Sequence, residues 1–172
     1  MVLVTPAVMH GAQYFWYVVS NGDNYLSGYS MNPTTGALTP VPGSPFATGA
    51  GPFGVIADPT GRFVYVANEA SGNVSGYAID PSTGTLTAVA NSPFTVGVNP
   101  LAVTVDPMGR FAYVGFGTNI AAYTIDQVTG ALTTVAGSPF CGGGIPRICN
   151  CESDGPVRLY SGRYWWRVCL HH

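Results

Sequence analysis

Two isolated carboxylates are the residues of this sequence that could do hydrolytic chemistry. Asp23 lies in "NGDN" and Glu69 in "NEASGN", so each is flanked by turn-forming residues. A carboxylate within hydrogen-bond reach of a water molecule can act as a general base and activate that water as a nucleophile. Asp23 and Glu69 are therefore the candidate catalytic residues. A solvated acid in a surface turn is the competing interpretation of each.

Two further acids stand four residues before an arginine and resemble catalytic pairs. They are Asp58 with Arg62 in "DPTGR" and Asp106 with Arg110 in "DPMGR". The order Asp, Pro, any residue, Gly is typical of a type I turn, in which the Asp side chain accepts backbone N–H bonds. A turn acid is needed in every copy of a repeat, whereas a catalytic group is needed once. We therefore interpret both pairs as structural.

The C-terminal segment offers soft metal ligands. They are Cys149, Cys151, Cys169, His171 and His172. A single Cys-x-Cys pair without a second paired spacing is a weak zinc signal, and four cysteines confined to the last 32 residues do not form a disulfide framework. The glycine-rich "CGGGIP" lacks the Lys and Ser or Thr of a phosphate-binding loop. The sequence therefore predicts no metal site and no cofactor.

The elements that would position the candidate acids come from an internal repeat. Three sets of anchors recur in register: Tyr29, Tyr77 and Tyr123; Gly36, Gly84 and Gly130; Phe46, Phe94 and Phe140. Each set is spaced by 48 and then by 46 residues. This period matches the length of one β-propeller blade. We expect the recurring tyrosines to pack between blades.

Each unit contains four strand signals separated by turns. In the middle unit these are the run around Val55–Ala57, "FVYVAN", "VSGYAID" and "TLTAV", with "DPTGR", "EASGN" and "DPSTG" between them. The predicted fold class is all-β, a partial β-propeller of four-stranded antiparallel blades, because radial packing of repeated sheets buries faces that a single sheet leaves exposed. A β-sandwich is the alternative, but its strands are not expected to recur at a constant period.

The repeat divides the chain into five segments. Residues 1–13 form an atypical N-terminal lead-in without the Asp-Pro turn or a convincing first strand. Residues 14–46 form a partial blade, 47–94 and 95–140 form one blade each, and 141–172 form an aberrant tail. A propeller closes with about four to eight blades. The chain therefore looks like a fragment of about three blades.

The blade motifs "RFVYVAN", "RFAYVGF", "SGYAIDPSTGTLTAV" and "GSPF" resemble those of the lactonase-type seven-bladed propellers, which include 6-phosphogluconolactonase-like and YVTN-repeat proteins. The resemblance covers about residues 14–140. It implies hydrolysis of a sugar lactone by the intact parent, with Asp23 or Glu69 as a base that activates water against the lactone carbonyl. A phosphorylated substrate would favour Arg or Lys, yet residues 1–140 contain two arginines, both in the predicted turns.

A frameshift would explain why the repeat stops at residue 141. Codons permitted for the segment from Cys141 onward, read one nucleotide later, encode "NPTGRFAY". The Asn of this motif falls twelve codons after Phe140, as Asp58 falls twelve residues after Phe46. We hypothesise a single-nucleotide frameshift near codon 141, in the gene or in its sequencing. A genuine cap on an incomplete propeller is the alternative, and resequencing the junction decides between the two.

Composition excludes some partners. The chain has no lysine and only 8% charged residues, so it cannot assemble the basic patch of a nucleic-acid-binding protein. The N-terminal "MVLVTPAVMHGAQ" lacks a positive region and is too short to span a bilayer. We therefore expect neither a signal peptide nor a membrane span. The compartment stays open, since an intact parent could be cytoplasmic or exported.

Three functional hypotheses remain. The first is a sugar lactone hydrolase, and the second is a non-enzymatic, exported propeller whose loops bind a protein or a glycan. The third is that the truncated chain is inactive by itself. Its open blade edges would then offer a route to self-association.

Overall fold

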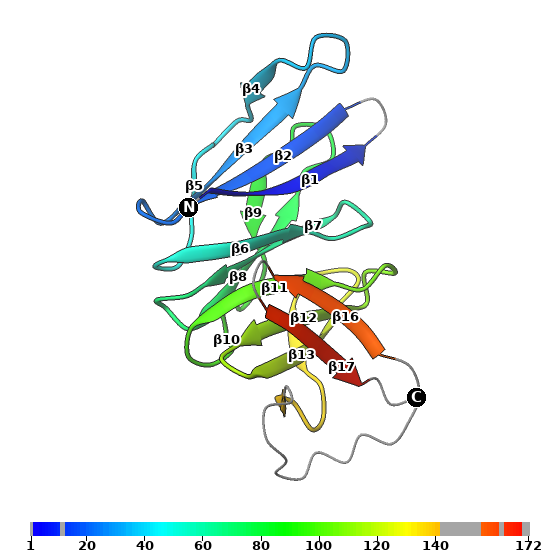
Figure 1. The fold of residues 1–172 in the computed structure, drawn as a ribbon. Helices are drawn as coiled ribbons and strands as arrows, with labels where there is room; N and C mark the ends of the chain where they lie inside the picture. The colour runs from blue at the N-terminus through cyan, green and yellow to red at the C-terminus, as the bar shows by residue number, and fades with distance from the viewer. Residues whose placement is uncertain (1, 11–12, 142–155, 162–163, 170–172) are drawn as a thin grey trace.

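The computed structural model describes residues 2–10, 13–141, 156–161 and 164–169, with side chains described for residues 14–141. Every element in these ranges is a strand, and three antiparallel sheets succeed one another along the chain (Figure 1). The first blade contains β1 (Val2–His10), β2 (Gln13–Ser20), β3 (Tyr25–Met31), β4 (Leu38–Pro40) and β5 (Phe46–Ala47). The middle blade contains β6 (Pro52–Ala57), β7 (Phe63–Asn68), β8 (Asn73–Ile79), β9 (Leu86–Ala88) and β10 (Phe94–Thr95).

The third blade repeats this arrangement with β11 (Pro100–Val105), β12 (Phe111–Phe116), β13 (Asn119–Ile125), β14 (Leu132–Thr134) and β15 (Phe140–Cys141). A separate two-stranded sheet of β16 (Pro156–Ser161) and β17 (Tyr164–Cys169) follows. The described part of the chain therefore has the predicted all-β architecture of a partial propeller. No helix that could span a membrane occurs among the described residues.

The first blade has an inner strand that the sequence analysis did not predict. Strand β1 pairs with β2 over its length, with an irregularity between Thr5 and Val8. The missing Asp-Pro turn hid this strand, although a run rich in valine favours extended backbone. The strands β1, β6 and β11 hold the same first position in their blades, and β6 lies next to both of the others. They form the innermost layer of the stack (Figure 1).

The outer strand of every blade is divided in two, and the predicted fourth strand "TLTAV" of the middle blade corresponds to the first part alone. In the middle blade, β9 pairs with one end of β8 and β10 with the other. Between them the chain leaves the sheet opposite Gly76, whose N–H donates to the Ser92 hydroxyl at 2.9 Å. Gly28 with Ser44 and Ala122 with Ser138 repeat this bond at 3.1 and 3.0 Å. The recurring Ser of "GSPF" and its counterparts therefore ties the outer edge to the third strand.

Apolar cores lie between consecutive blades. The side chains of one strand alternate between the two faces of its sheet, so a blade between two others is covered on both faces. All six residues of β7 are buried for this reason. Val64 and Val66 pack with the first blade, whereas Phe63 and Tyr65 pack with the third.

Candidate functional site

The loops that carry the two candidate acids lie at one end of the blades, which we call the loop end. Asp23 is in the β2–β3 loop and Glu69 in the β7–β8 loop. The segment that joins the first blade to the middle one touches both loops. Its Gly51 N–H donates to the Asn24 side-chain oxygen at 2.9 Å, and the Gly51 carbonyl accepts the Glu69 N–H at 2.7 Å. The structure therefore brings the second-to-third-strand loops and the blade-joining segment together.

Asp23 is exposed and is held within its own turn. Its Oδ2 atom accepts a hydrogen bond from the Ser20 hydroxyl at 2.7 Å. The Asp23 N–H donates to the Ser20 carbonyl at 3.3 Å, which closes the turn. This geometry is that of a turn acid that stabilises the loop, so Asp23 is the weaker candidate for a general base.

Glu69 differs from Asp23 because its backbone is fixed while its carboxylate is not. The residue is half-buried, and within residues 14–141 its carboxylate has no hydrogen-bond or ion-pair partner. The same loop position holds Asn21 in the first blade, whose side-chain N–H donates to the Pro52 carbonyl at 3.2 Å. A partly buried carboxylate without a hydrogen-bond or ion-pair partner keeps its lone pairs available to accept a proton from water.

Asn68, which the sequence analysis did not single out, is a fully buried amide directly before Glu69. Its Nδ2 group donates to the Asn73 Oδ1 atom at 2.8 Å and to the Ser75 hydroxyl at 2.9 Å. Its Oδ1 atom is buried and has no partner among the described residues. A Cβ added to Gly49 would lie 2.7 Å from the Asn68 Nδ2 atom, so the joining segment closes over this amide.

One sequence signal could have identified Asn68. It is the last residue of the second strand in its blade, where the other two blades have Ser20 and Phe116. Asn68 ends strand β7 and does not lie in a loop, unlike Asp23 and Glu69.

The two acid–arginine pairs lie at the opposite end of the blades, in the turns between first and second strands. The Asp58 carboxylate accepts the N–H groups of Arg62 and Phe63 at 2.7 and 2.8 Å. The Asp106 carboxylate accepts the Phe111 N–H at 2.8 Å and also bonds to the Arg110 N–H. Both acids are committed to backbone donors, in agreement with the structural interpretation.

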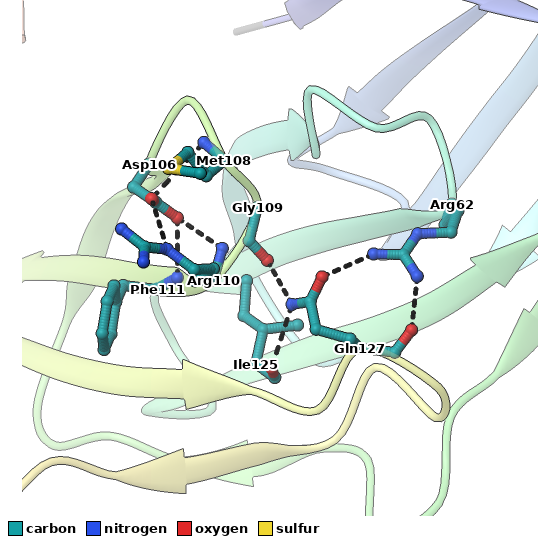
Figure 2. A network of polar contacts seen from close by, with 8 residues as sticks. All are labelled: Arg62, Asp106, Met108, Gly109, Arg110, Phe111, Ile125 and Gln127. Carbon is teal, nitrogen blue, oxygen red and sulfur yellow. Dashed lines mark hydrogen bonds and ion pairs between the residues drawn. The ribbon is translucent and has the colours of Figure 1, made fainter.

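The two arginines also have structural partners. Arg62 reaches the third blade, where its guanidinium donates to the Gln127 side-chain oxygen at 2.6 Å and to the Gln127 carbonyl (Figure 2). The Gln127 amide in turn donates to the Gly109 carbonyl at 2.7 Å. Arg110 forms an ion pair with Asp106 at 3.7 Å. Arg62 and Arg110, the two arginines of residues 14–141, therefore both lie at the end of the blades opposite to Asp23 and Glu69.

Groups with perturbed pKa values are structural as well. Burial raises the pKa of the Tyr17, Tyr65 and Tyr77 hydroxyls above its usual value. Hydrogen bonds from Ser82 and Thr83 lower the pKa of Asp80, and hydrogen bonds from Thr129 and Val128 lower that of Asp126. The three tyrosines lie at contacts between blades, and Asp80 and Asp126 lie in turns between third and fourth strands.

A metal site is not visible in the described part of the chain. Within it, no group of three or more His, Cys, Asp or Glu side chains could hold an ion. Cys141 is exposed. The other soft ligands considered above, namely Cys149, Cys151, Cys169, His171 and His172, lie outside the residues whose side chains are described.

Three solved structures show the same fold. A candidate 6-phosphogluconolactonase of Bacteroides uniformis matches with a TM-score of 0.70 at 18% identity, over 98% of this chain and 48% of its own. Another, of Bacteroides fragilis, matches with a TM-score of 0.69 at 20% identity, over 82% and 38%. The periplasmic gluconolactonase of Pseudomonas aeruginosa matches with a TM-score of 0.63 at 22% identity, over 80% and 40%.

The chain thus spans less than half the length of these three structures. No curated protein matches it in sequence. The profile of one family, described as "Lactonase, 7-bladed beta-propeller", matches residues 13–162, which is most of the chain. With its three sheets and their recurring turns, this chain belongs to the lactonase family of seven-bladed β-propellers.

Proposed function

We propose that the blades described here belong to a sugar lactone hydrolase in which Glu69 is the general base. The observation that carries this proposal is the Glu69 carboxylate itself, half-buried at the loop end and unpaired within residues 14–141. Membership of the lactonase family supports the reaction class, and one of the similar structures is a gluconolactonase. The sheets β1–β5, β6–β10 and β11–β15 would be three successive blades of that enzyme.

The proposed reaction is the hydrolysis of a ring ester. The Glu69 carboxylate takes a proton from water while the water oxygen bonds to the lactone carbonyl carbon. The bond between that carbon and the ring oxygen then breaks, and the ring oxygen takes up a proton. The product is the open-chain hydroxy acid.

The substrate class proposed is a neutral sugar lactone. A phosphate group is usually bound by Arg or Lys, and the two arginines of residues 14–141 are engaged at the opposite end of the blades. Asn and Ser side chains dominate the loops around Glu69 instead. Such groups suit the hydroxyls of an uncharged sugar.

The test compares the full chain with two variants in assays with glucono-δ-lactone and its 6-phospho derivative. The assays cover a range of chain concentrations. We expect the neutral lactone to be hydrolysed faster than in buffer alone. Glu69→Gln should lower this acceleration about 100-fold while lactone binding, followed by saturation-transfer NMR, is retained.

Asp23→Asn is the matched control, since it removes a carboxylate from the corresponding loop of the first blade. It should leave the acceleration within about twofold, because Asp23 is engaged by Ser20. An unchanged rate in Glu69→Gln would refute the role of Glu69. No acceleration by the unmodified chain at any concentration would refute the activity.

A further inference from the structure

Asn21 is followed by Gly22, and this is the only Asn-Gly pair in the sequence. The side-chain carbonyl carbon of an asparagine can be attacked by the backbone nitrogen of the next residue. Glycine offers the least resistance to this attack, because it has no Cβ and adopts backbone conformations that other residues avoid. The pair lies in the turn between β2 and β3, at the loop end.

The surroundings of the pair leave the attacking nitrogen free. Gly22 is exposed, and nothing lies within 4 Å of a Cβ added to it. Its N–H donates no hydrogen bond within residues 14–141. The Asn21 side chain has one restraint, the bond of 3.2 Å from its N–H to the Pro52 carbonyl, which is at the long end of the normal range. The reacting groups are therefore accessible and only lightly held.

The exposure of Gly22 is a property of this loop position. Ala70 occupies the same position in the β7–β8 loop of the middle blade. It is exposed as well, and its N–H donates no hydrogen bond within residues 14–141. The middle blade packs against a neighbouring blade on both faces. A blade on either side therefore leaves this position open.

Five other asparagines of residues 14–141 precede a residue that is a poor nucleophile at this step. Asn32 and Asn99 precede proline, which has no N–H. The other three precede bulky strand residues, which crowd the side-chain carbon. They are Asn24 before Tyr25, Asn73 before Val74 and Asn119 before Ile120.

The last two asparagines of this part of the chain are protected by hydrogen bonds. Asn68 precedes Glu69, whose N–H donates to a backbone carbonyl at 2.7 Å. Asn91 precedes Ser92, whose N–H also donates to a backbone carbonyl, at 3.1 Å. Asn21 is thus the one asparagine of residues 14–141 that is followed by a residue with neither a side chain nor an engaged N–H.

We infer that Asn21 is a modification site that deamidates spontaneously in the folded chain. The Gly22 nitrogen bonds to the Asn21 Cγ atom, and the side-chain amide leaves as ammonia, which takes up the Gly22 proton. Water then opens the cyclic imide at either of its C–N bonds. The product is aspartate or isoaspartate, with one water consumed and one ammonia released. This chemistry is independent of the proposed lactonase activity.

The modification changes how the first blade is fastened at the loop end. The new carboxylate has no N–H to donate to the Pro52 carbonyl, so two acceptors face each other where a bond existed. It also gives the first blade an acid at the position that Glu69 holds in the middle blade. The Asn24 side chain, which accepts the Gly51 N–H at 2.9 Å, remains to hold the loop to the blade-joining segment.

The test keeps the full chain in neutral buffer for several weeks, both folded and unfolded in urea. Chymotrypsin cleaves after tyrosine, so Asn21 and Asn24 are released together between Tyr17 and Tyr25. Mass spectrometry of the peptides measures deamidation at each asparagine, and isoaspartyl methyltransferase labels the isoaspartate product. Gly22→Ala is the matched variant, because the added Cβ meets nothing within 4 Å and the Asn21 bond is kept.

In the folded chain we expect Asn21 to convert roughly tenfold faster than Asn24 or Asn91, with isoaspartate among the products. Gly22→Ala should slow this conversion by roughly tenfold, because the Cβ hinders the approach of the nitrogen. Asn21→Asp stands for the aspartate product. It should lower the melting temperature by roughly 2–4 °C, since the bond to Pro52 is lost.

Three results would overturn the inference. The first is conversion of Asn21 in urea but not in the folded chain, which would mean that the fold protects the pair. The second is an equal rate at Asn21 and at Asn24 in the folded chain. The third is an unchanged rate in Gly22→Ala, since the nitrogen of residue 22 would then not be the attacking group.

Discussion

The hydroxyl of Tyr65 and the carbonyl of Gly130 are joined by a buried hydrogen bond of 2.8 Å, although the two residues are 65 positions apart in the chain. This bond and its copy between Tyr17 and Gly84 fix how one blade sits on the next. The recurring tyrosines and glycines of the repeat are therefore the donors and acceptors of one hydrogen bond that recurs between consecutive blades.

Removal of the Tyr65 hydroxyl should weaken the interface between the middle and third blades. Tyr65→Phe leaves the Gly130 carbonyl buried without its donor, and we expect a loss of about 1–2 kcal/mol in the free energy of unfolding. Tyr25→Phe is the control, because Tyr25 is half-buried and its hydroxyl has no hydrogen-bond partner within residues 14–141. Urea unfolding measures both. Equal losses in the two variants would contradict the structural role of the hydroxyl.

The interface glycines should respond to alanine according to their surroundings. Gly36, Gly84 and Gly130 all have positive φ, so alanine at each of these positions has a conformational cost of about 1 kcal/mol. At Gly130 the added Cβ would also lie 2.5 Å from the Phe63 ring, and a similar overlap occurs at Gly84 with Phe15. We expect Gly130→Ala and Gly84→Ala to lose roughly 2–4 kcal/mol.

Gly36→Ala is the matched control for these substitutions, because nothing lies within 4 Å of its added Cβ. Gly36→Ala should lose about 1 kcal/mol. A loss at Gly36 as large as the loss at Gly130 would mean that backbone conformation, and not the contact with phenylalanine, sets the requirement for glycine.

Gln127 stands where the other two units have proline, and it joins Arg62 to Gly109 (Figure 2). Gln127→Ala should lower stability by about 1 kcal/mol, since these bonds are partly exposed. Gln127→Pro loses the same bonds but stiffens the unfolded chain, so it should be less damaging by about 0.5 kcal/mol. Thermal unfolding of the two variants tests this order, and a more damaging proline would contradict it.

Two turn aspartates, Asp80 and Asp126, should make the stability of the fold depend on pH in the acidic range. The pKa values of Asp80 and Asp126 are lowered by hydrogen bonds to their carboxylates from the turn residues. A group whose pKa is lower in the folded state contributes stability above its unfolded pKa of about 4, and this contribution disappears as the pH falls through the folded pKa. The melting temperature should therefore decrease below about pH 4.

The double variant Asp80→Asn with Asp126→Asn should flatten this acid dependence while keeping the turns. The first unit already has Asn32 at this position, and its amide oxygen accepts the Thr34 and Thr35 N–H groups at 2.9 and 3.1 Å. Melting curves from pH 2 to pH 7 compare the variant with the unmodified chain. An unchanged slope below about pH 4 would show that other groups cause the acid sensitivity.

Repetition explains which parts of the structure could be predicted from the sequence. The turn at Asp58 and the strands around it recur in register, so local turn chemistry is enough to identify them. Tyr65 and Tyr77 also recur in register, and this recurrence predicts their packing between blades. Strand β1 could not be found in this way, because its turn lacks the repeated residues. The divided outer strand depends on a bond between Gly76 and Ser92, which are 16 residues apart and form no local pattern.

The candidate site was predictable only in part. The loop position of Glu69 follows from the strand order, and the absence of an acid at its counterparts marks it as unusual. The burial of Asn68 depends instead on Gly49, which approaches it from the segment between two blades. No spacing along the chain encodes that approach.

The divided outer strand has a consequence for where copies of this chain can meet. A continuous edge strand offers a row of free backbone groups to any other sheet. Here that row is short on both sides of each break, and prolines such as Pro42 and Pro45 stand in the interruption of the first blade, where they have no N–H to offer. The outer edge of each blade is therefore poor at pairing laterally with a sheet of another molecule.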